Sequence, residues 1–293
     1  MVEVVAQMRL DALTVEASRC LADAGIPHLL LKGPTTAQWL YDPPRLYRDV
    51  DLLIQAKDAR AATDSLRLAG IAAPVAGAMG EEAHHSQLLT TPHGLELDLH
   101  VALPSAPLPT PADEQQLWSA IAAQIKPFTV QGFDVPAFGF PGRCVVIALH
   151  SLSALADSQA VEDLDRARRL AGNDVWAQAL VLAAELGVER RVQSALDFAD
   201  NGHDPEALPL ENRLLVRGAS GAYQLQRLAH LPLPQLPCRV WAEIFPSPGF
   251  MRYGHPEFTS QRDLARAYLV RLLRLTRKLP SQLVILFREL RKG

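Results

Sequence analysis

The segment His28–Ile54, HLLLKGPTTAQWLYDPPRLYRDVDLLI, carries the pattern that decides the fold. An apolar strand ends at a lysine and a glycine turn, and a short helix follows whose first turn can hold Pro34. A basic loop then leads into a second strand with two aspartates. Because side chains alternate across a strand, Asp49 and Asp51 point to the same side.

A third acid lies on a later strand. In Leu95–Val101, LELDLHV, alternation puts the leucines on one face and Glu96, Asp98 and His100 on the other. Carboxylates that share a face repel one another unless a cation neutralises them. A hard divalent ion such as Mg²⁺ takes such oxygens and keeps places for substrate phosphate, and two ions could clamp a phosphoryl or nucleotidyl transfer.

The alternative for the acidic pair is a structural one. Asp49 and Asp51 would then lie at a solvated strand end and pair with Arg45 and Arg48. The glycine turn sixteen positions before Asp49 favours the functional interpretation, because free backbone N–H groups at a helix start can meet a phosphate there.

The rest of the chain changes character near residue 140. Strands and helices alternate before that point, and the pattern is helical almost throughout after it, so we expect an α+β protein with domains at 1–140 and 141–293. Expected strands are 28–31, 49–54, 71–75 at an edge, 86–91, 95–101 and 128–138. Expected helices are 6–24, 34–40, 56–69, 113–125, 143–156, 161–171, 174–186, 189–199, 210–228 and 259–279, the last ended by Pro280.

Composition narrows the function classes. A formal net charge of −3 over 293 residues argues against a protein that coats nucleic acid by charge alone. Cys20, Cys144 and Cys238 are scattered, which favours free thiols in a reducing cytosol. The first residues read as a helix and lack a signal-peptide pattern, and no apolar run approaches a membrane span. We expect a soluble, cytoplasmic protein without a membrane partner.

Several runs together resemble a known family. LLLKG, then LY, then R-x-x-R-D-V-D-L-L-I, then L-x-L-D-L-H, are similar to a bacterial family of uncharacterised nucleotidyltransferases within the DNA polymerase β superfamily. The segments Ile244–His255, IFPSPGFMRYGH, and Arg266–Arg271 resemble its C-terminal helical part. The resemblance implies a polymerase β-like nucleotidyltransferase core, with a mixed sheet and helices, followed by a mostly α-helical C-terminal domain.

The resemblance also implies roles for individual residues. The catalytic metal ligands would be Asp49, Asp51 and Asp98, with Asp98 also the general base toward the acceptor. The nucleotide would be bound by Lys32, Gly33, Thr35 and Arg45, the lysine and arginine contacting the leaving pyrophosphate. Many superfamily members have Gly-Ser after the first strand, whereas this chain has Gly33-Pro34-Thr35, so Thr35 or Thr36 would replace the serine.

The implied activity is a Mg²⁺-dependent transfer, with Mn²⁺ as a substitute, of a nucleoside monophosphate from an NTP such as ATP to an acceptor. The acceptor class stays open between a small molecule, a peptide, a protein and an RNA end. Two alternatives also stay open. One is an inactive nucleotide-binding or scaffolding protein, suggested by Pro34, and the other is a metal-dependent phosphohydrolase with water as acceptor.

Other residues are weighed against structural roles. His84, His85 and His100 could suggest zinc, but His100 beside Asp98 fits a supporting partner or an exposed polar residue better. His150 fits a core histidine, or one that reaches Asp163 or Asp165. The last long helix is basic, which fits either a solvated face or a wall that contacts phosphates. Trp39 and Tyr41 are expected to pack in the core. The basic residues of the last long helix, 259–279, are Arg262, Arg266, Arg271, Arg274, Arg277 and Lys278.

Overall fold

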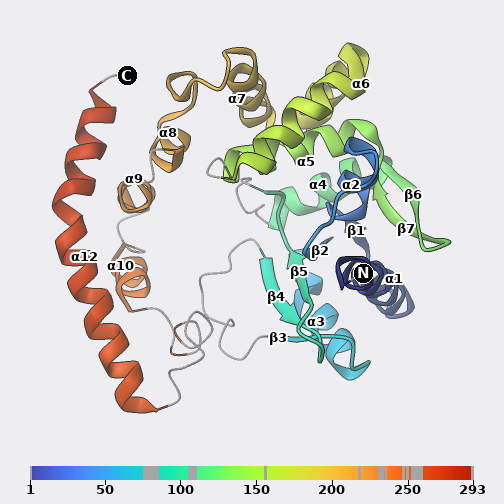
Figure 1. Cartoon of the computed structure of the whole chain (residues 1–293), viewed down its shortest axis with the longest axis horizontal. Coiled ribbons are helices and arrows are strands. Elements are labelled where there is room, and N and C mark those ends of the chain that lie inside the picture. The colour runs from blue at the N-terminus through green and yellow to red at the C-terminus, as the bar shows by residue number, and fades with distance from the viewer. Residues whose placement is uncertain are drawn as a thin grey trace. The chain divides into compact units, whose positions relative to one another are not determined.

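The computed structural model describes residues 2–74, 86–104, 111–154, 157–216, 219–229, 234, 236–245, 248, 251 and 260–291. Contacts divide the chain into two compact units, of which the first holds the described residues up to Ala199 and the second holds those from Asp200 on. The first unit contains the whole described sheet, and the described part of the second is helical (Figure 1). The predicted α+β class is therefore confirmed.

The first unit is built on a mixed seven-stranded sheet in the order β3-β4-β5-β2-β1-β7-β6. β2 lies at its centre, antiparallel to β1 and parallel to β5, and β1 is parallel to β7. The strands are β1 (His28–Leu30), β2 (Asp49–Ile54), β3 (Ala73–Pro74), β4 (Ser86–Thr90), β5 (Glu96–His100), β6 (Ile125–Val130) and β7 (Phe133–Phe138). The short β3 lies at an edge of the sheet, as expected, because proline has no N–H to donate to a second neighbouring strand.

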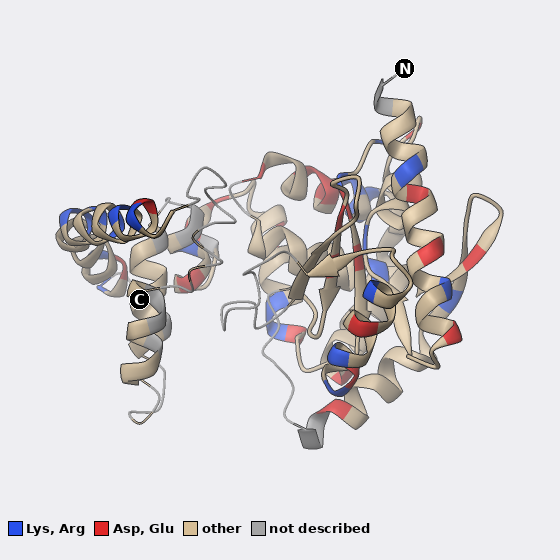
Figure 2. Ribbon diagram, turned by 90° about the horizontal axis from the view of Figure 1, so that it is seen from below, with Lys and Arg blue, Asp and Glu red and all other residues tan. Residues whose placement is uncertain are grey.

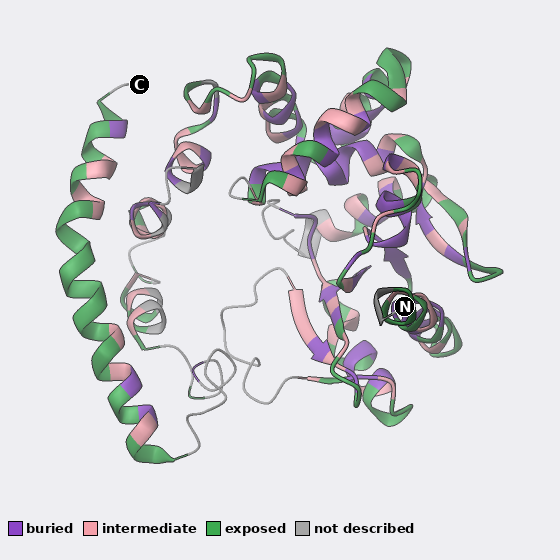
Figure 3. Cartoon of the chain, in the orientation of Figure 1, coloured by how far each residue is buried: buried purple, intermediate pink, exposed green. Residues whose placement is uncertain are grey.

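One face of this sheet is the apolar core. Val50, Leu52 and Ile54 of β2 alternate with the aspartates and are fully buried together with Leu97 and Leu99 of β5. Helices α1 (Val2–Asp23) and α3 (Ala59–Leu68), the latter after a 3-10 turn η1 (Ala56–Asp58), supply the matching apolar side chains. Figure 3 shows the buried residues concentrated in the sheet and in the helix faces turned toward it.

Further helices of the first unit complete the fold. α5 packs along α6 and against β7, and the short α2 contacts α6. These helices are α2 (Pro34–Leu40), α4 (Pro111–Ala123), α5 (Phe140–Ser153), α6 (Ser158–Glu185) and α7 (Glu189–Asp200). α6 is interrupted at Gly172, whose φ of 74° and ψ of 167° are not helical, so the two helices expected there form two parts of one broken element.

The single strand expected over 128–138 is wrong, because the region forms the hairpin β6–β7. Gln131 and Gly132 connect the strands with φ values of 48° and 80°, as a two-residue turn with two left-handed positions requires. The glycine adopts that conformation without strain, whereas Gln131 is an unusual residue there, so the turn carries a weak sequence signal.

The described part of the second unit consists of η2 (Pro205–Ala207), α8 (Leu210–Val216), α9 (Ser220–Ala229), α10 (Leu236–Ile244) and α12 (Gln261–Leu290). Where one helix was expected over 210–228 there are two, α8 and α9. α12 continues through Pro280, so the predicted break there is wrong. Packing stabilises α12 on both sides of Pro280. Leu264 and Ala267 are buried before the proline, and Ile285 and Leu286 pack against the cluster around Leu214 after it.

Charge is unevenly distributed on α12. Its basic residues greatly outnumber Asp263 and Glu289, and Figure 2 shows Lys and Arg gathered along this helix. Asp263 forms a capping box with Ser260, and Glu289 pairs with Arg213 of α8 at 3.3 Å. Both acids therefore serve the helix and its packing. The phosphate-contacting wall stays a prediction.

The change in secondary structure and the division by contacts fall at different residues. The change from strands to helices does fall at residue 140, between β7 and α5. The contacts instead keep α5, α6 and nearly all of α7 with the sheet up to Ala199. The division into functional domains at 140 stays a prediction. Among the described helices, none combines the length and apolarity needed to cross a bilayer.

The seating of α5 on β7 can be tested at Gly142. A Cβ atom there would lie 2.3 Å from Cδ1 of Phe138, a ring that is fully buried. We expect Gly142→Ala to lower the free energy of unfolding by about 1–3 kcal/mol, the usual cost of overpacking, measured by urea denaturation. Combining it with Phe138→Leu should recover part of that loss, and strictly additive effects would contradict the contact.

Candidate metal and nucleotide site

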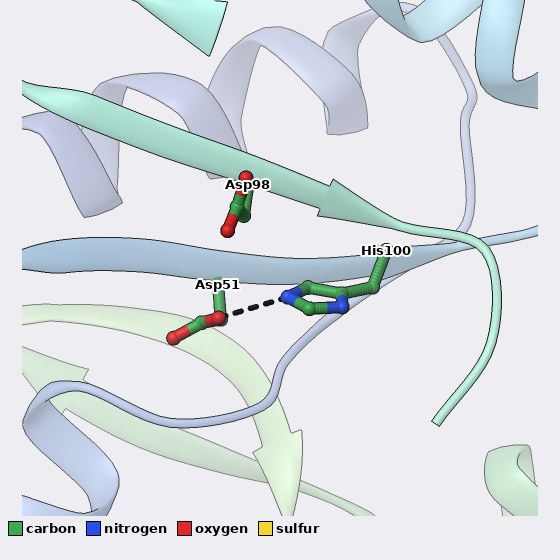
Figure 4. A group of neighbouring side chains, drawn as sticks. All are labelled: Asp51, Asp98 and His100. Carbon is green, nitrogen blue, oxygen red and sulfur yellow. Dashed lines mark hydrogen bonds and ion pairs between the residues drawn. The ribbon is translucent and has the colours of Figure 1, made fainter. Parts of the chain in front are cut away.

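The site is set by how β2 pairs with β5. In this parallel pair Asp51 lies opposite Asp98 and Leu53 opposite His100. Residues two apart on a strand share a face, so both acids and the histidine project from the sheet on one side. Figure 4 shows the two carboxylates on neighbouring strands, with the His100 ring turned toward Asp51.

Asp51 is the buried centre of the group. Its side chain is 2% exposed, and its Oδ1 accepts a hydrogen bond from His100 Nε2 at 2.8 Å and lies 3.3 Å from Lys32 Nζ. Burial alone would raise the pKa of Asp51, but the Lys32 charge and the His100 hydrogen bond and charge together lower it below its ordinary value. Asp51 is therefore ionised at neutral pH.

Asp98 has the opposite tendency. Burial raises the pKa of its carboxyl to about 6, and the neighbouring charges of Asp51 and Asp49 add to this, while His100 and Lys32 act against it. Two facing carboxyls thus differ in proton affinity, which is how one site can hold a permanent anion beside a group that exchanges a proton.

The group fits a divalent cation. Asp51, Asp98 and His100 each offer one ligand atom, and these atoms lie within 4.8 Å of one another. Asp51 Oδ2 and His100 Nδ1 are buried and have no hydrogen-bond partner among the described residues. Unpaired buried polar atoms are costly unless something completes their coordination. Two oxygens and a nitrogen suit Mg²⁺ or, better, Mn²⁺.

Asp49 does not belong to this group in the described chain. It is half-buried at the start of β2, opposite Glu96, and burial followed by the charge of Asp51 raises its pKa. Its role as a ligand stays a prediction. In the described chain His100, rather than Asp49, completes the group with Asp51 and Asp98, although the sequence suggested only a supporting role for it. The available signal was its place on the same strand face as Asp98.

The glycine turn after β1 is shaped by Tyr47. Gly33 has a φ of 69°, and a Cβ there would lie 3.2 Å from Cδ2 of the Tyr47 ring. Tyr47 is itself held to α1, because its backbone N–H donates to Gln7 Oε1 at 3.2 Å and its hydroxyl donates to Asp11. Sequence reasoning missed this residue. Gly33 is thus required by backbone conformation and by the close ring.

Thr35 and Lys32 occupy this turn as well. Thr35 is 1% exposed, and its hydroxyl donates to the backbone oxygens of Leu31 and Lys32 at a long 3.4 Å. Lys32 lies two residues after the end of β1 and pairs with Asp51, so its charge belongs to the acidic site. Binding of phosphate by Lys32, Gly33 and Thr35 stays a prediction.

Arg45 pairs with an acid that the sequence did not connect to it. Its Nη2 donates to Asp163 Oδ2 on α6 at 2.6 Å, so it does not form the ion pair with Asp49 or Asp51 considered as the structural alternative. Tyr41 donates to the other oxygen of Asp163, and it is half-buried where full core packing was expected. Trp39 packs against Phe140, with ring centroids 5.3 Å apart.

Two other predictions concern histidines. His150 of α5 is half-buried, and burial, with the charge of Lys32, lowers its pKa to about 4, so it is neutral. Asp163 is bound by Tyr41 and Arg45 rather than by His150. His84 and His85 lie outside the described residues, as do Arg252 and Tyr253 of the C-terminal signature.

Comparisons with known proteins find one family model and two solved structures that are similar to the chain. A family model described as "Uncharacterised nucleotidyltransferase" matches residues 3–201. The solution structure of the antibiotic-resistance factor ANT(2'')-Ia is similar at 12% identity and a TM-score of 0.41, over 68% of this chain and 99% of that one. A crystal structure of an antigenic nucleotidyltransferase-like protein from Paracoccidioides brasiliensis is similar at 18% identity and a TM-score of 0.38, over 65% and 85%. These TM-scores are too low to assign residue roles. No curated protein matches the sequence.

The contact between Gly33 and Tyr47 can be separated from backbone strain. Gly33→Ala should lower the free energy of unfolding by more than the roughly 1–2 kcal/mol that a left-handed conformation costs an L-residue. Gly70→Ala is the matched control, because Gly70 has a φ of 70° and a Cβ there would meet nothing within 4 Å. Equal losses in the two variants, measured by chemical denaturation, would mean that the Tyr47 ring yields freely.

The raised pKa of Asp98 predicts a pH-dependent stability. Between its ordinary pKa near 4 and about 6 the folded state holds more protons than the unfolded state, so stability falls as pH rises through this window. Asn cannot ionise. Asp98→Asn should therefore gain stability relative to the wild-type chain from pH 4 to 7.5, by about 1–3 kcal/mol, in urea titrations with EDTA present. A difference that does not change with pH would refute the raised pKa.

Proposed function

Since the chain belongs to the uncharacterised nucleotidyltransferase family, we propose that it transfers a nucleoside monophosphate from an NTP to an acceptor, with release of pyrophosphate. The observation that carries the proposal is the convergence of Asp51, Asp98 and His100, with Asp51 Oδ2 buried and unsatisfied among the described residues. We propose that this group holds Mg²⁺ or Mn²⁺, with Asp49 as a further ligand two residues before Asp51 on the same strand face.

The residues have separate tasks in this proposal. The acceptor oxygen bonds to the α-phosphorus, its proton passes to the Asp98 carboxylate, and the bond from that phosphorus to the oxygen of the pyrophosphate breaks. Asp51 stays ionised throughout, since Lys32 and His100 stabilise its charge. A bound divalent ion would supply electrostatic stabilisation of the charge on the phosphates.

The leaving pyrophosphate needs cations of its own. Lys32 lies next to the acidic group and Arg45 lies in the loop that leads into β2, so we propose that both contact the departing phosphates. Gly33 and Thr35, in the turn after β1, would face the triphosphate with backbone N–H groups. Arg is suited to phosphate because its fixed fork of donors matches two oxygens at once.

Metal binding is the first test, since it needs no acceptor. Mn²⁺ affinity, measured by electron paramagnetic resonance, should fall at least about 10–100-fold in Asp51→Asn and in Asp98→Asn. Asp64→Asn is the control, because Asp64 is an exposed acid on α3, which packs against the opposite face of the sheet. Unchanged Mn²⁺ affinity in both site variants would exclude this group as the metal site.

Turnover is the second test. Each α-labelled NTP is incubated with Mg²⁺ or Mn²⁺ and a cell extract as the source of acceptor, and labelled product and pyrophosphate are measured. Asp51→Asn should reduce labelling at least about 100-fold, whereas Asp64→Asn should not change it. Free phosphate without labelled product would instead indicate the phosphohydrolase. Nucleotide binding without any product would indicate the binding or scaffolding protein.

A further inference from the structure

We propose that Asp163 of α6 is a positioning residue that fixes the orientation of the Arg45 guanidinium, so that Arg45 can bind the β- and γ-phosphates of the nucleotide. This inference rests on the proposed function, because it concerns how the same site holds its NTP. It extends the site to a helix that follows the whole sheet in sequence, and to a residue more than 100 positions away from the phosphate-binding loop.

Both oxygens of Asp163 are engaged by the loop between α2 and β2. Arg45 Nη2 donates to Oδ2 at 2.6 Å, and the Tyr41 hydroxyl donates to Oδ1 at 2.5 Å. Gln159, one turn earlier on α6, donates to the Tyr41 oxygen at 2.5 Å. Asp163 itself is 3% exposed. A carboxylate held at both oxygens has one orientation, and it therefore imposes one orientation on the arginine.

The Tyr41 ring adds a second constraint. The guanidinium of Arg166 lies 4.3 Å from its centroid, and that of Arg45 lies 5.4 Å from it. Arg166 is in turn bound to Glu162 at 2.6 Å. Cations near an aromatic face are attracted to it. Arg45 is thus restrained by an ion pair and by a ring, so little side-chain freedom remains to be lost when it binds a ligand.

Arg45 keeps donors for that ligand. Its side chain is 30% exposed, and Asp163 is bound through Nη2, which leaves the second terminal nitrogen outside this ion pair. Nε is buried and has no hydrogen-bond partner among the described residues. An unsatisfied buried donor on a restrained guanidinium is the arrangement expected of a site that awaits an anion.

Arg45 also lies in the electrostatic neighbourhood of the metal site. Burial lowers the pKa of His150 of α5, and the charges of Lys32, Asp51, Asp157 and Arg45 act on the same side chain. Tyr47, two residues after Arg45 in the same loop, packs against Gly33 in the turn beside Lys32, so the loop that carries Arg45 lies against the proposed phosphate turn. A triphosphate whose α-phosphate lies at Asp51 can extend its outer phosphates toward Arg45.

A purely structural role predicts a different pattern of losses. If Asp163 only joins α6 to the loop, its replacement should lower stability and weaken all nucleotides alike. A positioning role instead affects only ligands that carry the outer phosphates, since Arg45 would not contact a monophosphate. The ratio of NTP affinity to NMP affinity therefore separates the two roles.

The test is calorimetric titration with each ribonucleoside triphosphate and its monophosphate in the presence of Mg²⁺, on the full chain. Asp163→Asn and Tyr41→Phe should weaken NTP binding about tenfold or more and leave NMP binding within twofold. Arg45→Ala should do the same, and Arg45→Ala with Asp163→Asn should be no worse than Arg45→Ala alone. Asp174→Asn is the control on the same helix, because Asp174 is an exposed acid of α6 outside these contacts, and it should change neither affinity.

Each outcome has a definite meaning. Equal loss of NTP and NMP affinity in Asp163→Asn, or no loss in a variant that melts like the wild-type chain, would overturn the positioning role. If Asp163→Asn fails to fold, the milder Tyr41→Phe decides by the same ratio. Wild-type binding of NTP without turnover would count against the transferase alone, since the affinity ratio is still measured. Absence of NTP binding by the wild-type chain would overturn both proposals.

Discussion

The parallel pairing of β2 with β5 is the constraint on which the site depends. It places Asp51 and Asp98 opposite each other, with His100 two residues further on the same face. The other faces of the same strands are buried in the apolar core, so a shift of one residue in register would bring the acids into that core. Hydrophobic burial on one side therefore enforces the crowding of charge on the other, and Lys32 and His100 offset part of its cost at Asp51.

The loop between α2 and β2 is attached to two helices beside this charged strand. Tyr47 ties it to α1 and packs beside Gly33, while Tyr41 and Arg45 tie it to α6. Two attachments on different helices fix a segment that has no regular secondary structure of its own. The altered Gly33-Pro34-Thr35 turn is thereby supported from outside, by a tyrosine ring against the glycine, rather than by a capping side chain.

Local sequence pattern predicts much of the fold. Alternation located β2 and β5 and put Asp98 on a polar face, and apolar spacing located most helices. What it could not supply was contact between distant segments. No local pattern joins Asp163 to Arg45, and the contact of His100 with Asp51 depends on the register between β2 and β5. Two predictions were wrong for another reason. The turn between β6 and β7 has Gln131 in an unusual left-handed conformation, and tertiary packing keeps α12 helical through Pro280.

The ion pair between Arg45 and Asp163 has a consequence for how the chain folds. It closes a loop between residues 118 positions apart, and the entropy of such closure must be met before the contact can form. Pairing of β1 with β2 is local by comparison and can form early. A refolding chain should therefore regain its central strands first and the orientation of Arg45 only when α6 docks, so that this ion pair forms later than the sheet at its centre.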